Sequence, residues 1–290
     1  MMKNEVATQK KQGIASFLAS DAVKNNIMSV VGEKDAQKFI SSVVSAVQTN
    51  PALAECTNSS ILSVALVGHS LNLPHSPQLG YYWFVPFENK KKDANGNEYR
   101  VKEATFQLSY RGYIQLALRS GDYKKIHVTD IKEGELKSYN PITDEFEFEP
   151  ITDYEERKKK ETIGYYAFFI LTNGFKKELY WSKEKMNDHA LKYSATYRSD
   201  KKWVKDKALW TTNFDDMAYK TLIRMIISKH GIMRTDMATA YQSDMAVIDE
   251  NGVPEYVDNV PDEPEKAVDV MADVIDGEFT EIKNEQNEQN

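Results

Sequence analysis

The 290-residue chain predicts an α+β fold, with a compact core of β-hairpins packed with helices. Helical patterns come first along the chain, strand patterns with hairpin turns follow, and helical patterns return after residue 182. Elements that are segregated in this way, without regular alternation, are typical of α+β proteins. The hydrophobic content of 41% is high enough for a sizeable core.

In the first half, apolar residues at helical spacing and several capping or turn signals define the expected elements. Asn58 or Ser59 is expected to cap one helix, and Ser109 caps another that ends near Gly121. The dipeptide Asn95-Gly96 marks the turn of a hairpin. In chain order we expect helices over 14–31, 35–47 and 58–70, strands over 81–87 and 104–108, and a helix over 109–121.

In the second half, strand patterns precede the last helices. Asn173-Gly174 marks a second hairpin turn, and Ser182 starts a helix. Asn213 caps the strongest helical pattern, which ends before Gly231. In chain order we expect strands over 123–131 and 145–149, a hairpin over 163–181, a helix over 182–193, a basic loop through 207, and helices over 214–230 and 236–247.

Charge is distributed unevenly along the chain. The net charge is −7, but residues 249–290 hold 14 acidic and 2 basic residues, so the rest of the chain carries +5. A basic body with an acidic tail suggests a nucleic-acid partner, and the tail is too polar to fold by itself. We expect a mobile N-terminal segment with a short helix over 1–34, a core over 35–248, and a disordered acidic tail over 249–290.

Several classes of protein are disfavoured by what the sequence lacks. Cys56 is the single cysteine, which excludes an intrachain disulfide and a Cys-rich zinc site. No signal-peptide core and no membrane-length apolar run occur, so we expect a soluble, cytoplasmic protein. There is no GxxxxGK[ST] phosphate loop, no GxGxxG after a strand and no HExxH, and the five histidines are scattered. We therefore expect no ATP use, no metal site and no catalytic residues.

The densest functional signal lies in residues 192–234, where cations alternate with aromatic residues. Cations bind a phosphate backbone without reading its sequence, and flat rings stack on exposed bases. Trp203 stands among five cations in the ten residues 198–207, in a stretch with weak helical periodicity. The alternative is a solvated helical face with core aromatics. This composition points to Tyr197, Lys202, Trp203, Lys205 and Lys207 as contacts with single-stranded nucleic acid.

Two helices offer further cations. Lys220 and Arg224 are four residues apart and share a helical face, which we expect to point outward. The alternative for Lys220 is a salt bridge to Asp216, which lies in the first turn of that helix, where the helix dipole favours carboxylates. Arg111 and Arg119 share a face of the 109–121 helix, and Tyr110 and Arg111 lie near its N-terminus, with the alternative of a buried tyrosine beside a surface arginine.

The hairpin at 88–102 is a weaker candidate. Its lysines at 90–92, joined by Arg100 and Lys102, are expected in a loop that either clamps nucleic acid or is merely solvated. Carboxylates at 144–149 and 215–216 could serve a two-metal nuclease, but their spacing is unspecific.

Three stretches are distinctive in combination: SVALVGHSLNLPHSPQLGYYWFVPF at 63–87, FQLSYRGYIQLALRSGDYKKI at 106–126 and ALWTTNFDDMAYKTLIRMIISKHG at 208–231. With them the chain resembles the RecT family of phage single-strand DNA annealing proteins, or recombinases, over about residues 35–235. The resemblance implies a protein that binds and pairs single strands without ATP, in rings or helical filaments, during phage homologous recombination. By motif match, it implies DNA contacts by Tyr110, Arg111, Arg119, Asn213, Phe214, Lys220 and Arg224.

The resemblance also implies partners and a division of labour. DNA binding and oligomerisation fall to the core over 35–248, and the N-terminal helices are candidates for subunit contact, with a plain core role as the alternative. The expected partners are single-stranded DNA, the annealed duplex intermediate, a phage exonuclease and the single-strand-binding protein of the bacterial host. No cofactor is expected, with magnesium only as an aid to annealing. The acidic tail could compete with DNA, dock a partner or keep the protein soluble. Alternative functions are a passive single-strand-protecting protein and a metal-dependent nuclease.

Overall fold

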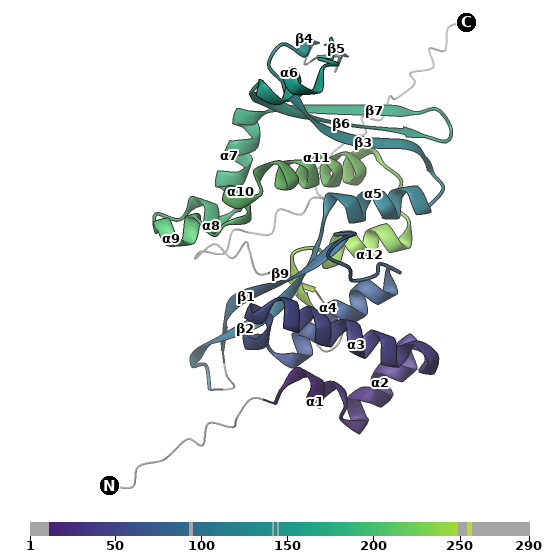
Figure 1. The fold of residues 1–290 in the computed structure, drawn as a ribbon, viewed down its shortest axis with the longest axis vertical. Coiled ribbons are helices and arrows are strands. Elements are labelled where there is room, and N and C mark those ends of the chain that lie inside the picture. Colours follow the sequence, from purple (N-terminus) through teal and green to yellow (C-terminus); the bar gives the residue numbers. More distant parts are fainter. Residues whose placement is uncertain (1–11, 93–94, 141, 144, 249–253, 257–290) are drawn as a thin grey trace, which may run out of the picture. The chain divides into compact units, whose positions relative to one another are not determined.

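The computed structural model describes residues 12–92, 95–140, 142–143, 145–248 and 254–256. It confirms the α+β class, with antiparallel sheets covered by helices (Figure 1). In the first half the elements are α1 (Ile14–Leu18), α2 (Asp21–Val31), α3 (Glu33–Thr49), the 3-10 helix η1 (Pro51–Glu55), α4 (Asn58–Ser70), β1 (Tyr82–Lys92), β2 (Glu98–Leu108), α5 (Tyr110–Arg119), β3 (Tyr123–Lys132), β4 (Leu136–Asn140) and β5 (Glu145–Phe148).

In the second half, helices precede and follow a long hairpin along the chain. Its elements are α6 (Tyr154–Lys159), β6 (Thr162–Leu171), β7 (Lys176–Ser182), α7 (Lys183–Tyr193), α8 (Ala195–Arg198), α9 (Lys202–Lys205), α10 (Leu209–Thr212), α11 (Phe214–His230), α12 (Thr235–Ser243), β8 (Ala246–Ile248) and β9 (Pro254–Tyr256). The described strands form sheets in the orders β1-β2-β8-β9, β3-β6-β7 and β4-β5, in which all paired strands are antiparallel.

The N-terminal helices pack beside the β1–β2 hairpin, with α4 against β2 (Figure 1). The sequence predicts one helix over 14–31, but the chain forms two, which meet at Ser20. Leu18 on α1 and Ile27 on α2 are fully buried in the hydrophobic core. Thr57, and not Asn58 or Ser59, caps α4, because its hydroxyl accepts from the backbone N–H of Ser60.

The second sheet, β3-β6-β7, is covered by α11, which lies across one of its faces (Figure 1). Tyr165 and Phe169 on β6 are fully buried, and so are Leu222 and Ile226 on α11. Burying these large side chains stabilises the pair by about 1.5–3 kcal/mol for each side chain relative to exposure. The expected α11 boundaries are confirmed, although Asn213 makes no side-chain capping bond.

Helix α5 connects the two sheets, because it contacts β2, β3 and α11. Ser109 caps it as expected: its hydroxyl accepts from the N–H of Gly112 at 3.2 Å and donates to the carbonyl of Gly80 at 2.5 Å. A Cβ at position 112 would lie 2.3 Å from the Tyr81 carbonyl oxygen, so glycine allows α5 to approach the start of β1.

Other elements differ from the prediction. The lysines at 90–92 lie in β1 and not in a loop, since β1 and β2 pair from Tyr82↔Leu108 to Lys92↔Glu98. The strand β4 and helix α6 were not predicted, and the expected basic loop contains the short helices α8 and α9, with α10 directly after it. Residues 254–256, expected in the tail, continue the sheet as β9. The remainder of the 249–290 tail and residues 1–11 lie outside the described residues.

Candidate nucleic-acid interface

A cleft of about 580 Å³ lies among β1, the segment 193–210 and α11. Four of the residues predicted from the sequence line it together, and they come from two separate parts of the chain: Trp203, Lys207, Lys220 and Arg224. Its other walls are largely apolar and include Phe87, Tyr193, Trp210, Met217, Met225 and Tyr241. The fold therefore brings the basic-aromatic segment and α11 to one concave surface.

The segment 194–207 is held by local contacts. Ser194 caps α8, and the Tyr197 hydroxyl donates to Asn187 Oδ1 at 2.9 Å, which ties α8 to α7. The ammonium of Lys205 lies 5.4 Å from the centre of the Tyr197 ring. Tyr197 is partly buried and packs against the core, and its hydroxyl has a partner within the chain.

Trp203 differs from the other tryptophan of this segment. Its side chain is 66% exposed on α9, whereas Trp210 is 6% exposed and packs edge-on against Phe214 at 5.2 Å. Lys202, Lys205 and Lys207 are also exposed. An exposed indole beside exposed ammonium groups is the arrangement that stacking on a base and neutralising its phosphate require.

Lys220 does not point outward. It is only 6% exposed, and its Nζ donates to Asp244 Oδ1 at 2.7 Å. The expectation that Lys220 and Arg224 present their charges outward from one face is wrong for Lys220, and its partner is Asp244 and not Asp216. The reason is tertiary: the residue after α12 places a carboxylate under α11.

The side chain of Arg224 is partly buried beside Asp244 and partly exposed to the cleft. Its guanidinium carbon lies 4.1 Å from the centre of the Tyr241 ring, and its Nε lies 3.7 Å from Asp244 Oδ2. The Nε atom is buried without a hydrogen-bond partner. The side chain is still 32% exposed and lines the cleft.

Asp244 is the centre of this group, and sequence reasoning missed it. It is fully buried and also accepts from the backbone N–H of Leu108 and the hydroxyl of Tyr113, both at 2.9 Å. Burial raises the pKa of Tyr113 well above its ordinary value, and the negative charge of Asp244 adds to this effect. Asp244 lies 24 residues beyond Lys220 in an unremarkable stretch, so no local pattern could identify it.

Three other predicted residues lie away from the lining of this cleft. Arg119 donates to the carbonyls of Leu71 and Asn72 and to Asp236, so it joins the end of α4 to α12. Tyr110 packs edge-on against Tyr219, and the exposed Arg111 donates to its hydroxyl at 3.3 Å. Arg119 thus has hydrogen-bond partners from two other segments, and Arg111 is exposed at the surface.

The start of α11 combines a packed ring with an exposed amide. Phe214 is half-buried between Trp210 and Tyr165, while Asn213 is exposed. Asp215 accepts from the Tyr165 hydroxyl at 2.6 Å. That contact and burial, which is the larger effect, raise the pKa of Tyr165. Phe214 therefore supports the wall that carries Trp210.

Three cations of the β1–β2 hairpin are matched with carboxylates across the two strands or from η1. Lys91 pairs with Glu103 at 2.7 Å, Arg100 pairs with Glu88 at 2.6 Å, and Lys102 pairs with Glu55. Such pairs reduce the net positive charge of this surface. The hairpin is for that reason a weaker candidate than the cleft.

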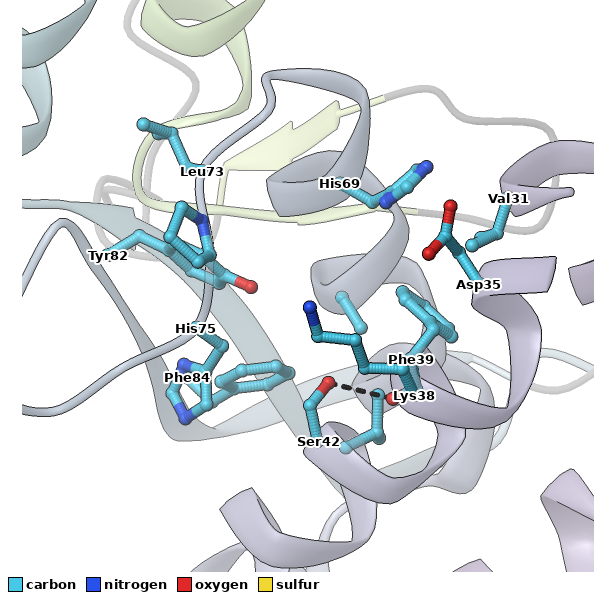
Figure 2. A pocket seen from close by; sticks show the side chains of 13 residues that line it. Val31, Asp35, Lys38, Phe39, Ser42, His69, Leu73, His75, Tyr82 and Phe84 are labelled. Atoms are coloured by element: carbon cyan, nitrogen blue, oxygen red, sulfur yellow. Dashed lines mark hydrogen bonds between the residues drawn. The ribbon is translucent and has the colours of Figure 1, made fainter.

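A separate cavity of about 280 Å³ lies among α3, α4 and β1 (Figure 2). The His75 ring packs there against Phe84 at 4.7 Å and Tyr82 at 5.4 Å between centroids. Its Nδ1 is buried without a hydrogen-bond partner, and burial lowers the pKa of His75. Asp35 and Lys38 line the same cavity from α3. None of the predicted DNA contacts is among its lining residues.

An α+β body with a cationic, aromatic cleft is the kind of protein that can hold an anionic chain. The chain belongs to the RecT family, whose model matches residues 37–259. It is 34% identical to the uncharacterized protein YqaK of Bacillus subtilis (strain 168), over 98% of this chain and 93% of that protein. It is 24% identical to protein RecT of Escherichia coli (strain K12), over 76% of each chain.

Family membership supports a general role in DNA recombination and annealing, and suggests single-stranded DNA binding and oligomerisation. Proteins of this family are annealing proteins rather than catalysts. Among the described residues, no group of three or more His, Cys, Asp or Glu side chains could hold a metal ion. No helix in the described ranges has the length and apolar character needed to cross a bilayer.

Proposed function

We propose that this protein is an ATP-independent single-strand DNA-binding and annealing protein that pairs complementary strands during phage homologous recombination. The observation that carries the proposal is the cleft, in which the exposed Trp203 and the cations Lys207 and Arg224 face one space. Membership of the RecT family gives this surface its context. The charged side chains that line the cleft are cations, which favours an anionic ligand.

The physical demands of annealing fit this surface. Two strands repel each other through their phosphates, and a basic groove offsets that repulsion. The bases must keep one edge free, because a second strand has to test them for complementarity. Few stacking contacts for each subunit therefore serve annealing better than many. In the 194–210 segment, Trp203 is the exposed tryptophan, while Trp210 is buried.

We further propose that the core over 35–248 binds DNA and oligomerises into rings or helical filaments, with the N-terminal helices in the subunit contact. Val30 on α2 is 54% exposed, which leaves an apolar side chain on that surface. Head-to-tail contacts of one surface with another produce open helices when the rotation does not close. A phage exonuclease and the host single-strand-binding protein are the proposed protein partners, in the bacterial cytoplasm.

The test uses two complementary oligonucleotides with a donor and an acceptor dye. Energy transfer is followed with and without the full-length protein, in magnesium and without nucleotide. We expect pairing to be much faster with the protein, and to persist without ATP. Binding without faster pairing would instead identify a passive protective coat. Loss of strands that depends on magnesium would identify a nuclease.

A further inference from the structure

The buried carboxylate of Asp244 has three hydrogen-bond donors from three elements. Its Oδ1 accepts from the Leu108 N–H at 2.9 Å and from Lys220 Nζ at 2.7 Å, while Oδ2 accepts from the Tyr113 hydroxyl at 2.9 Å. The end of β2, α5 and α11 therefore meet at one fully buried group. Lys220 is the cation that satisfies its charge.

Arg224 is the second cation at this group, and it is left over. One carboxylate faces two cations, and the 3.7 Å from Arg224 Nε to Oδ2 is too long for a hydrogen bond. The Tyr241 ring supports the guanidinium at 4.1 Å but cannot accept an in-plane N–H bond. The Nε atom itself is buried, so an anion in the cleft reaches Arg224 through the exposed part of its side chain, which is 32% exposed and lines the cleft.

The surroundings of Arg224 favour an anion. Lys207 and Lys229 line the same cleft, and among the residues that the structure describes no carboxylate lines it. His189 also lines it, and burial, with smaller effects from Arg224 and Lys192, lowers the pKa of this histidine. Among the described residues, Asp244 is the carboxylate that pairs with Arg224, and Lys220 already occupies it. A planar guanidinium matches the oxygens of a phosphate.

We propose that Asp244 and Lys220 form a positioning pair that leaves Arg224 free to bind one backbone phosphate of single-stranded DNA, and that Lys220 itself touches no phosphate. This inference rests on the proposed function. The proposal gives different roles to Lys220 and Arg224, which appear equivalent from the sequence. Lys220 acts by occupying Asp244, which would otherwise neutralise Arg224.

The positioning pair predicts that one substitution lowers the affinity for single-stranded DNA and that a second substitution restores it. Lys220→Met leaves Asp244 with one cation within reach, so Arg224 turns onto Oδ2 and its charge is lost to the ligand. Adding Asp244→Asn removes the competing charge: the amide oxygen at the Oδ1 position still accepts from the Leu108 N–H, and the amide nitrogen at the Oδ2 position donates to the Tyr113 hydroxyl oxygen. Arg224 then faces the cleft again.

The experiment measures affinity for a fluorescent oligo-dT over a salt series, with full-length wild type, Lys220→Met, Asp244→Asn and the double variant. Lys220→Met is expected to lower affinity about tenfold and to reduce the salt slope by about one. The double variant is expected to return to within about threefold of wild type with the wild-type slope, as differences below that are small on this scale. A double variant as weak as Lys220→Met, with the same reduced slope, would show that Lys220 touches phosphate and would overturn the proposal.

Arg224→Gln keeps the Asp244–Lys220 pair intact and decides the question if the double variant does not fold, as checked by thermal melting. We expect it to lose affinity at least fivefold more than Lys229→Gln, a matched loss of one charge from the same helix and cleft. Equal losses would mean that the cleft attracts DNA by diffuse charge and would overturn the assignment to Arg224. Wild-type protein that fails to bind oligo-dT at all would overturn the proposed function instead.

Discussion

At the scale of single residues, we expect buried charged groups to contribute more to the stability of this protein than exposed ones. Asp244 is fully buried with three donors, so removing its carboxylate leaves Lys220, Tyr113 and a backbone N–H unsatisfied. By contrast, Arg119 and Asp236 form a pair that is largely open to solvent. Variants at the two sites test how burial changes the contribution of an ion pair to the free energy of unfolding.

We predict that Asp244→Ala lowers the free energy of unfolding by about 3–5 kcal/mol, because it leaves a buried cation without its partner. Asp236→Ala, the exposed control, is expected to cost less than about 1 kcal/mol. Urea denaturation followed by circular dichroism measures both. Similar small losses in the two variants would contradict the role given to Asp244.

A second prediction at the residue scale concerns the stability of the protein at acidic pH. Asp130 and Glu135 both have lowered pKa values: burial opposes ionisation, but hydrogen bonds and charge from Lys132 and Arg157 outweigh it. Since the folded pKa values lie below the unfolded ones, this stability is present above about pH 4 and is lost as pH falls through the folded pKa values.

We therefore expect the free energy of unfolding to fall between pH 5 and 3, as read from urea curves over about that range. Arg157→Met should weaken this dependence, because Arg157 bonds to Glu135 at 2.7 Å and pairs with Asp130 at 3.4 Å. Lys158→Met, an exposed neighbour on α6, is the control and should keep the wild-type slope. An Arg157→Met curve that runs parallel to wild type would show that these carboxylates are not held by Arg157.

At the scale of elements, the contacts of α5 determine how the two sheets are joined. The Ser109 hydroxyl caps α5 and also donates to Gly80 before β1, so one side chain fixes both the start of the helix and the loop that precedes the hairpin. Tyr113 on the same helix bonds to Asp244, which links α5 to the cleft. Loosening the N-terminus of α5 should therefore also disturb the candidate site.

Ser109→Ala is predicted to cost about 1–2 kcal/mol of stability, through loss of the cap. Ser41→Ala is the matched control. Ser41 is exposed within α3, and its hydroxyl donates to the Gln37 carbonyl of the same helix. Thermal melts compare the two. An equal, small change in both variants would mean that the cap contributes little to the junction of the sheets.

At the scale of the whole molecule, the balance of charge is the feature with a functional consequence. Residues 257–290 carry 11 acidic and 2 basic residues, a net charge of −9, while the cleft is lined by cations. We predict that a chain ending at residue 256 keeps its thermal melt and binds single-stranded DNA with equal or higher affinity at low salt, since charge screening weakens with falling salt. Salt-titrated oligo-dT binding measures this. Weaker binding without the segment would show that it contributes to the DNA contact.

The sequence by itself determined several of the elements and the family. The helix 214–230, the cap at Ser109 and the turn at Asn173-Gly174 are local signals, because capping, periodicity and turn chemistry depend on residues a few positions apart. The resemblance to the RecT family came from whole stretches and is confirmed. The basic-aromatic composition likewise identified Trp203 and Lys207, which do line the cleft.

Only the tertiary structure decided what each cation faces. Lys220 and Arg224 look equivalent on a helical wheel, yet one is buried on Asp244 and the other opens to the cleft. Arg119, which stays a predicted DNA contact, also joins the end of α4 to α12 through partners that its own helix does not supply. The partners in these contacts are distant in sequence, and desolvation, which separates a structural cation from a binding one, exists only once the chain has packed.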